Sequence, residues 1–347
     1  MKGVVFTGDR KAEIREFSTP DPGPGEVRVR MKTSSICGTD MHFYRKSWED
    51  LVAFREVLGG SPDTITGHEP CGVVEETGAG VRSFRPGDRV SVYPHIGCGT
   101  CRYCRLGDVM FCPDRGSYGT KYDGSAADCV IAPERNCLSL SDAIDFEKAA
   151  VLACVGSTAY QSIERVDASG EDTMGIFGLG PVGLCAVAFA AARGARVIGV
   201  DLVPERLELA QQLGAWQVID ASGGDPAEKA LDLTGGKGIS AGADYSGHPR
   251  AQEAMMACAG KYARLALVGV GEKFQVDTFQ GMIMKQMTLT GSWLYNIGLY
   301  EEVVDFVLEK ELPLERLITH RFRLDRAVEA FELFDTGRCG KVLFTWD

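Results

Sequence analysis

Hydrophobic and polar positions change their rhythm along the 347 residues of the chain. From residue 1 to about 150, short β-type runs alternate with turns rich in Gly and Pro, and these runs include EVRVRM, CGVVEE and DRVSVYP. Short runs bounded by Gly and Pro predict strands. We therefore expect an irregular, β-rich first domain in which no long amphipathic helix dominates.

The middle of the chain, from about 155 to 290, alternates strand-like runs with helix-like patterns. The runs are TMGIF, ARVIGVD, WQVID, AGADYS, ARLALVGV and MTLTGS, and the helical patterns include VPERLELAQQLGA and HPRAQEAMMACAG. Strands that alternate with helices are typical of a doubly wound parallel sheet. The tail predicts helices followed by a closing strand, which need not belong to the middle domain.

One apolar stretch, residues 174–200, is hydrophobic enough to resemble a membrane span. Gly178, Gly180, Pro181 and Gly183 divide it into strand, turn and helix, so we expect no membrane insertion. The N-terminus MKGVVFTGDRKAEIREF lacks the apolar core and cleavage site of a signal peptide. A cytoplasmic location with reduced thiols is the expectation that follows.

Charge and length narrow the functional classes further. The chain carries 37 Lys and Arg against 48 Asp and Glu, a formal net charge of -11. Because nucleic-acid binding depends on neutralising phosphates with Lys and Arg, this balance argues against a nucleic-acid partner. The length exceeds that of one ordinary hydrophobic core and favours two domains.

Four of the twelve cysteines lie close together: Cys98, Cys101, Cys104 and Cys112. In a reducing compartment, the spacing CxxCxxCx7C predicts a tetrahedral zinc site of four thiolates, which stabilises a loop poor in apolar residues. Disulfides would require an oxidising compartment and very small rings, and the last gap does not match ferredoxin spacings. Since all four positions are filled by protein, we expect this zinc to be structural.

A second set of candidate ligands is dispersed. The segment SSICGTDMHFY supplies Cys37, and TITGHEPCG supplies His68. A lone Cys or His is more often a core residue than a ligand, but a catalytic zinc needs three protein ligands and one open position. By spacing alone, three residues compete for the third position: Cys129, Cys137 and Cys154.

The pattern GxGxxG follows an apolar strand and opens an alanine-rich helix, the context of a dinucleotide-binding turn. Glycines let the backbone approach a pyrophosphate at the helix N-terminus. The expected contacts are Gly178, Gly180, Pro181, Val182 and Gly183. Asp201 closes the next strand, where an acidic residue accepts from the ribose hydroxyls and repels a 2′-phosphate, which favours NAD over NADP. Arg206 either flanks this ribose or lies on a solvated helix face.

Taken in order, these motifs resemble the medium-chain zinc-dependent alcohol dehydrogenases, and the resemblance covers nearly the whole chain. It rests on the segment from Cys37 to Asp40, on Gly67–Glu69, on the cysteine cluster, on the Gly-rich turn and on Asp201. The resemblance implies an α/β protein in which a Rossmann domain with a doubly wound parallel sheet is inserted into a GroES-like, β-rich catalytic domain. The implied domains are 1–154, 155–290 and 291–347, the last returning to the catalytic domain.

The resemblance also implies two zinc ions and NAD as cofactors. It makes Cys37, His68 and Cys154 the ligands of the catalytic zinc, with Glu69 as a neighbour that can coordinate transiently. Many polyol dehydrogenases of the family carry Glu at the third position, so Cys154 departs from them. The implied reaction transfers hydride from a zinc-bound alkoxide to NAD.

Three further residues acquire roles through the resemblance. Thr39 takes the alcohol proton and passes it through the nicotinamide ribose to His42 and water, and Asp40 accepts from the ring N–H of His68. Without the zinc pattern, Thr39 and Asp40 are equally helix caps and His42 a surface histidine.

Other implied contacts with the cofactor have ordinary alternatives. Val268 and Val270 resemble a strand end that meets the carboxamide, but they also fit a buried strand. Lys341 reaches the pyrophosphate or caps the preceding helix. Trp293 and Tyr295 lie where the family closes its substrate pocket or its subunit interface. Because the family forms dimers and tetramers, we expect a homodimer or homotetramer.

The substrate is the least determined feature. The segment between Cys37 and His68 carries polar and aromatic groups that suit a hydroxylated or charged alcohol, although a solvated helix face is the alternative; they are Tyr44, Arg45, Lys46, Trp48 and Arg55. We expect a secondary alcohol such as a polyol, sugar or cyclitol derivative. The alternatives are a primary or aromatic alcohol, which Cys154 favours, and a non-catalytic, zinc-stabilised nucleotide-binding scaffold or sensor.

Overall fold

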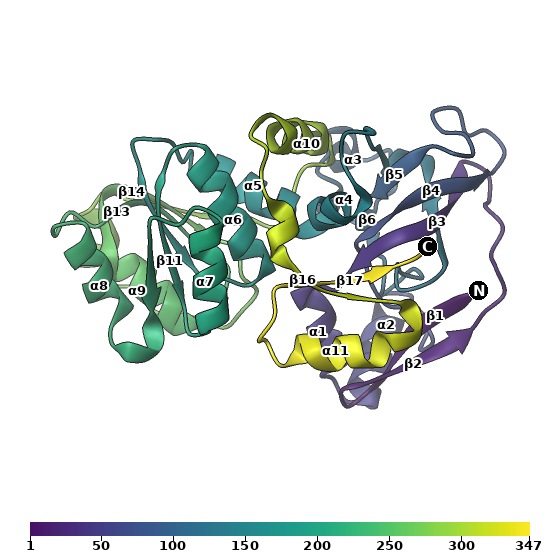
Figure 1. The fold of residues 1–347 in the computed structure, drawn as a ribbon, viewed down its shortest axis with the longest axis horizontal. Coiled ribbons are helices and arrows are strands. Elements are labelled where there is room, and N and C mark those ends of the chain that lie inside the picture. The colour runs from purple at the N-terminus through teal and green to yellow at the C-terminus, as the bar shows by residue number, and fades with distance from the viewer. The chain divides into compact units, whose positions relative to one another are not determined.

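A computed structural model describes residues 1–347 (Figure 1). The chain divides into two compact units. The first comprises Met1–Cys154, Tyr295–Leu308 and Ile318–Asp347, and the second comprises Val155–Leu294 and Glu309–Leu317. The first unit thus breaks off after residue 154 and resumes at residue 295, whereas the sequence places the domain boundaries after residues 154 and 290. The short segment 309–317 joins the second unit although the sequence assigns it to the tail.

The second unit contains a six-stranded parallel sheet in the order β12-β11-β10-β13-β14-β15. Its strands are β10 (Thr173–Phe177), β11 (Arg196–Asp201), β12 (Gln217–Asp220), β13 (Ile239–Asp244), β14 (Ala259–Leu267) and β15 (Thr288–Gly291). The strand order reverses at β10, which pairs with β11 on one side and β13 on the other. This is the predicted doubly wound sheet, and its switch point is where such folds bind ligands.

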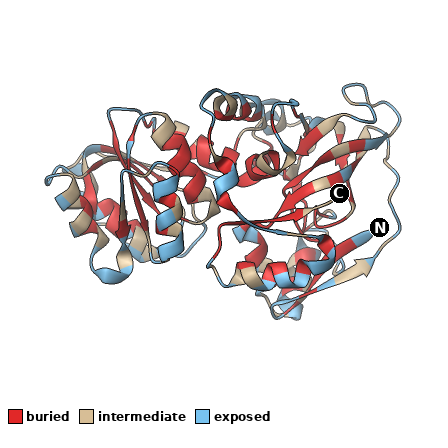
Figure 2. Cartoon of the chain, viewed as in Figure 1, coloured by how far each residue is buried: buried red, intermediate tan, exposed pale blue.

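Helices connect these strands, as the alternating pattern predicts. They are α6 (Pro181–Ala192), α7 (Pro204–Gln212), α8 (Pro226–Leu233) and α9 (Pro249–Cys258), and α5 (Ser157–Arg165) precedes the first strand. Four of them start with proline at the first helical position, where its missing N–H costs nothing. The central strands are buried along almost their whole length (Figure 2), as the continuous apolar runs of parallel strands require.

The first unit is built on a seven-stranded sheet in the order β16-β17-β3-β4-β5-β9, with β8 also paired to β3. Its strands are β3 (Glu26–Ser35), β4 (Pro70–Thr77), β5 (Arg89–Val92), β8 (Cys129–Pro133), β9 (Cys137–Ser139), β16 (Ile318–Phe322) and β17 (Lys341–Thr345). The C-terminal β17 lies beside β3 (Figure 1). The two strands pair antiparallel, and Leu343 is opposite Ser35. The C-terminal strands β16 and β17 therefore extend the sheet beyond β3.

Smaller elements surround this sheet. Two antiparallel pairs are formed by β1 (Lys2–Gly8) with β2 (Lys11–Glu16) and by β6 (His95–Ile96) with β7 (Gly116–Ser117). The helices are α1 (Gly38–Tyr44), α2 (Trp48–Val57), α3 (Arg102–Arg105), α4 (Phe146–Val151), α10 (Tyr300–Glu309) and α11 (Ala327–Asp335). Phe6, Tyr44 and Phe331 bring β1, α1 and α11 together in one aromatic core cluster.

Irregular helical turns complete the description. The 3₁₀ turns are Val109–Phe111, Glu134–Asn136, Ala221–Gly223, Ile297–Leu299, Leu314–Leu317 and Leu324–Arg326, and the π-helical turns are Leu152–Gly156 and Phe279–Ile283. None of the helices combines the length and the hydrophobicity needed to cross a membrane.

Candidate functional site

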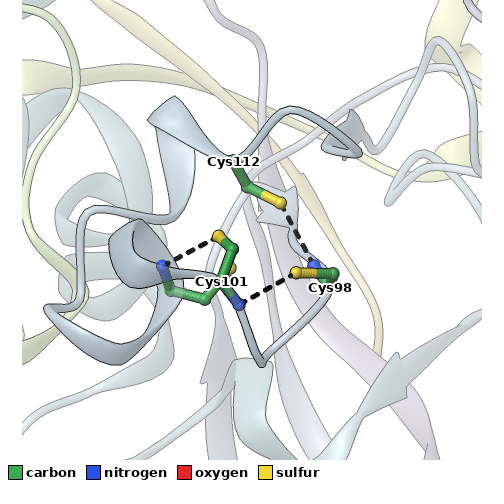
Figure 3. A group of neighbouring side chains, drawn as sticks. Cys98, Cys101 and Cys112 are labelled. Carbon is green, nitrogen blue, oxygen red and sulfur yellow. Dashed lines mark hydrogen bonds between the residues drawn. The ribbon is translucent and has the colours of Figure 1, made fainter.

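The four clustered cysteines converge in the first unit. Their sulfur atoms all lie within 4.8 Å of one another. The backbone N–H of Cys98 donates to the sulfur of Cys112 at 3.3 Å, and the N–H of Cys101 donates to the sulfur of Cys98 at 3.3 Å (Figure 3). Amide donors favour the thiolate, and those of Thr100 and Cys101 lower the pKa of Cys98 to about 6.

This lobe fits a zinc ion. Four sulfurs around a Zn–S distance of about 2.3 Å would be roughly 3.8 Å apart, close to the observed convergence. All twelve cysteines are free thiols, so no disulfide competes for these four. Gly97 also matters, because a Cβ at this position would lie 2.6 Å from the sulfur of Cys104. Spacing predicts the four cysteines, but not the need for a glycine behind them.

A second convergence unites the dispersed candidates. Ligand atoms of Cys37, His68, Glu69 and Cys154 lie within 4.8 Å of one another, and all four residues belong to the first unit. Cys37 precedes α1, His68 and Glu69 precede β4, and Cys154 lies in the π-helical turn after α4. The structure thus brings Cys154 to the set. The competing candidates are elsewhere, on β8 and β9.

Asp40 connects two of these residues. One carboxylate oxygen accepts from the backbone N–H of Cys37 at 2.8 Å, and the other lies 3.1 Å from Nδ1 of His68. A proton on Nδ1 leaves Nε2 as the ring nitrogen available to a metal. The sequence offered a helix cap and a histidine partner as alternatives, and the structure shows that one buried side chain makes both contacts.

The electrostatics of the cluster favour a bound cation. A hydrogen bond from Cys154 and the nearby His68 hold the pKa of Cys37 well below its usual value. The pKa of Cys154 is raised by that same hydrogen bond and by burial. Burial would lower the pKa of His68, but the effects of Asp40 and Cys37 outweigh that of burial, and the pKa is well above its usual value. Because several anionic groups meet in a buried space, a divalent ion would relieve their repulsion.

Glu69 supplies the most direct sign of a missing partner. Its Oε2 accepts from the hydroxyl of Ser35 and lies 2.6 Å from Nζ of Lys341, whereas its Oε1 is buried without a hydrogen-bond partner. Burial raises the pKa of Glu69 to about 7, although Lys341 opposes this shift. Buried polar atoms are almost always satisfied. An unsatisfied carboxylate oxygen beside two thiols and an imidazole therefore fits a zinc ion.

Lys341 differs from its expected position. It is fully buried on β17 and faces Glu69, so its partner lies inside the first unit, in place of the pyrophosphate or the helix carbonyls that the sequence offers as alternatives. Strand pairing explains this placement: the N–H of Ile36 donates to the carbonyl of Val342, which sets Lys341 beside the residues around Cys37.

Two exposed side chains lie next to the cluster. Thr39 Oγ1 is 3.8 Å from the sulfur of Cys37, and His42 follows three residues later on α1. Residues three apart share one face of a helix. Both side chains are exposed, in contrast to the buried ligands. Their use as a proton path stays a prediction.

The Gly-rich turn lies between β10 and α6 in the second unit. Glycine occupies each of its three positions for a different reason. Gly178 has a φ of +87°, and a Cβ there would lie 2.7 Å from the backbone N of Ser246. A Cβ at Gly183 would lie 1.9 Å from the carbonyl oxygen of Gly178. A Cβ at Gly180 would meet no atom within 4 Å beyond its own chain neighbours and helix backbone. Gly180 thus leaves open the space at the N-terminus of α6 that a pyrophosphate would fill.

Asp201 closes β11 beside this turn. Its Oδ2 accepts from the N–H of Leu179 at 2.6 Å, and its Oδ1 accepts from the N–H groups of Leu202 and Val203. Arg206 Nη1 lies 3.8 Å from the Asp201 carboxylate. Arg206 therefore lies beside Asp201, and its contact with a ribose stays a prediction.

Two protein-family models match this chain, one in its N-terminal part and one in its later part. A model of the alcohol dehydrogenase GroES-like domain matches residues 23–142, and a model of the zinc-binding dehydrogenase domain matches residues 181–309. The chain is 34% identical over 357 aligned residues to YphC of Escherichia coli K12, an uncharacterized zinc-type alcohol dehydrogenase-like protein, covering 100% of this chain and 99% of the relative. The chain belongs to the zinc-dependent alcohol dehydrogenases.

Other members of this family extend the comparison. An L-threonine 3-dehydrogenase of Xanthomonas campestris pv. campestris is 32% identical over 96% of both chains. The structure of the alcohol dehydrogenase TADH from Thermus sp. ATN1 matches with a TM-score of 0.90 at 28% identity, covering 99% of both chains. A structure from Escherichia coli CFT073 complexed with NADH, described as a short chain alcohol dehydrogenase, matches with a TM-score of 0.88 at 29% identity, covering 100% of this chain and 99% of that one. The family makes this chain an NAD-dependent zinc oxidoreductase.

One histidine that the charge of His68 affects has no signal in the sequence. His95 is a half-buried histidine on β6, just before the cysteine cluster. Burial, with a smaller effect of the charge on His68, lowers its pKa to about 3, so its imidazole is neutral at physiological pH. A single His on a two-residue strand follows no ligand spacing, which is why the pattern did not mark it.

Of the residues expected at the substrate or the nicotinamide, some are buried in the core and others are exposed. Tyr44 is a core residue, and Arg55 is buried with its guanidinium donating to the carbonyl of Pro62 at 2.7 Å. Neither side chain is available to a substrate. Val268 and Val270 follow the end of β14, and Val270 is 70% exposed, which excludes the alternative of a buried strand for it.

Proposed function

We propose that this dehydrogenase oxidises a secondary alcohol to a ketone and reduces NAD. The observation that carries the proposal is the buried set Cys37, His68 and Cys154, with the unsatisfied Oε1 of Glu69 beside it. Relatives named L-threonine 3-dehydrogenase support a secondary alcohol, because the 3-hydroxyl of threonine is one. Both sites need reduced thiols, which supports a cytoplasmic location.

The chain's own residues divide the work. When bound, zinc lowers the pKa of the substrate hydroxyl and NAD accepts the hydride. Cys37, His68 and Cys154 would hold the metal, and Asp40 fixes the tautomer of His68. Thr39 takes the proton of the hydroxyl, and His42, exposed on the same helix, passes it to water.

We propose a polyol, sugar or cyclitol derivative as the substrate. A β-hydroxy amino acid such as L-threonine is the second candidate, favoured by the relatives that are 32% identical. Asp201 supports selection of NAD over NADP, because its carboxylate beside the Gly-rich turn would repel a 2′-phosphate.

The test is metal content and cofactor reduction on the wild-type protein, over a panel of polyols, sugars, cyclitols, L-threonine, and primary and aromatic alcohols. We expect two zinc ions per chain and the highest kcat/KM on a secondary alcohol, with NAD preferred over NADP. One zinc per chain and no reduction of either cofactor would refute the proposed activity and favour the alternative of a non-catalytic nucleotide-binding scaffold. A clear preference for primary alcohols would refute the secondary-alcohol proposal alone.

We further propose that the chain forms a homodimer or homotetramer through the edge of the second unit's sheet. Strand β15 pairs only with β14, so its other edge is free of strand partners. Phe279, Ile283 and Met284, just before β15, are exposed apolar side chains. Natural proteins cover such edges and patches, and a second copy of the chain would do so.

The solution mass of a variant with Ile283→Asp and Met284→Asp tests this interface. We expect the wild type to have the mass of a dimer or tetramer by light scattering and the variant to have a lower one, because two charges would enter the interface. Val57→Asp, at an exposed apolar position on α2 in the first unit, is the matched control and should leave the mass unchanged. A variant that keeps the wild-type mass would exclude this edge.

A further inference from the structure

Tyr295 is a fully buried tyrosine to which the reaction assigns no role. It is the first residue of the segment with which the chain re-enters the first unit. Its hydroxyl donates to the carbonyl of Ala153 at 2.6 Å, and Ala153 directly precedes the metal-ligand candidate Cys154. The points where the chain leaves and re-enters the unit are thus joined by one hydrogen bond.

The accepting carbonyl lies in an irregular turn. Residues 152–156 form a π-helical turn between α4 and α5. Such turns interrupt the regular hydrogen bonding of an α-helix and are frequent at functional sites. The position of Cys154 therefore depends on contacts from outside the helix, and the Tyr295 hydroxyl supplies one at the adjacent residue.

Tyr295 is itself fixed by a second buried tyrosine. The hydroxyl of Tyr93 donates to the carbonyl of Tyr295 at 2.7 Å, and the two rings meet edge to face with their centroids 5.0 Å apart. Edge-to-face aromatic pairs add specificity of orientation to the burial of the rings. Burial raises the pKa of Tyr295 well above its usual value, so its phenol remains a donor.

The residues after Tyr295 bind the cysteine lobe. Asn296 Nδ2 donates to the carbonyl of Leu106 at 2.7 Å and to Asp108 Oδ1 at 2.9 Å, and the N–H of Ile297 donates to the carbonyl of Gly107 at 2.9 Å. A Cβ at Gly107 would lie 2.3 Å from Asn296 Oδ1, so the contact leaves no room for a side chain there. Leu106, Gly107 and Asp108 lie between two of the lobe's zinc ligands, Cys104 and Cys112.

We propose that Tyr295 is a positioning residue for Cys154 and that residues 295–297 link the structural lobe to the catalytic metal site. The lobe, folded around its metal, holds Asn296 and Ile297. These residues fix Tyr295, and its hydroxyl holds the turn that presents Cys154. The inference rests on the metal site of the proposed function.

The experiment compares Tyr295→Phe with the wild-type zinc enzyme by the rate at which each ion is released to a chelator, and by the visible spectrum after cobalt substitution. We expect one of the two ions to leave roughly 10-fold faster, as for other contacts that orient ligands, and the thiolate-to-cobalt bands of the catalytic site to change. Tyr118→Phe is the matched control, because Tyr118 is equally buried and its hydroxyl donates to the carbonyl of Ile131. This control should match the wild type in both measurements.

Wild-type release rates of both ions and an unchanged cobalt spectrum in Tyr295→Phe would overturn the inference. Should that variant fail to fold, Tyr93→Phe carries the same test with the same two outcomes, because it removes the hydrogen bond that fixes Tyr295. A failure of the proposed function is visible separately, since the wild type itself would then bind a single ion.

Discussion

Replacing Cys37 with serine is expected to abolish turnover and to lower the zinc content from two ions per chain to one. Serine offers a neutral hydroxyl where zinc binds a thiolate, and hydroxyls are not among the usual ligands of zinc in proteins. Loss of a Lewis acid worth several kcal/mol should lower kcat at least about 1000-fold. The cysteine lobe uses none of the residues of this cluster, so its ion should remain.

Cys129→Ser is the matched control for this substitution. Cys129 is a buried cysteine on β8 and belongs to neither metal cluster, so its variant should keep two zinc ions and most of the activity. The measurement is zinc per chain by atomic emission together with the rate of NAD reduction. Two ions in Cys37→Ser would show that Cys37 is not a ligand, whereas loss of both ions would show a general failure of the fold.

Local features of the chain were predictable from the sequence because their signals are local. TMGIF is an apolar run bounded by polar and glycine residues, and it is strand β10 from Thr173 to Phe177. The four-cysteine spacing likewise needs only one loop to bring its sulfurs together.

Contacts between residues far apart in the chain could not be predicted from the sequence. Spacing left three cysteines in competition for the third ligand position, and only the folding of the first unit brings Cys154, at its break point, to His68. The partners of Lys341 and Tyr295 depend on strand register and on where the chain re-enters the first unit. Pair contacts of this kind have no periodicity, so composition and spacing cannot predict them.

Breaking the buried ion pair of Lys341 and Glu69 is expected to lower the stability of the protein strongly. Both side chains are 0% exposed, and Nζ lies 2.6 Å from Oε2. Removing one partner of a buried pair leaves an uncompensated charge, which costs about 3–5 kcal/mol. Lys341→Met should therefore lower the free energy of unfolding of the zinc enzyme by about that amount in urea denaturation. Arg323→Met, which breaks the exposed pair with Asp347, is the control and should have no measurable effect.

A double variant separates this charge effect from simple loss of packing. Combining Lys341→Met with Glu69→Gln removes both charges, and replacing a whole buried pair by neutral groups is far less costly than breaking it. We therefore expect the double variant to be more stable than Lys341→Met alone, although it carries one more substitution. Contacting residues that share a charge interaction are not independent, so we do not expect the losses of the two single variants to add up in the double variant. If the double variant lost as much unfolding free energy as Lys341→Met and Glu69→Gln lose together, the two residues would not be coupled. Lys341 would then act as a packing residue of β17, and the buried carboxylate of Glu69 would depend on the metal alone for its compensation.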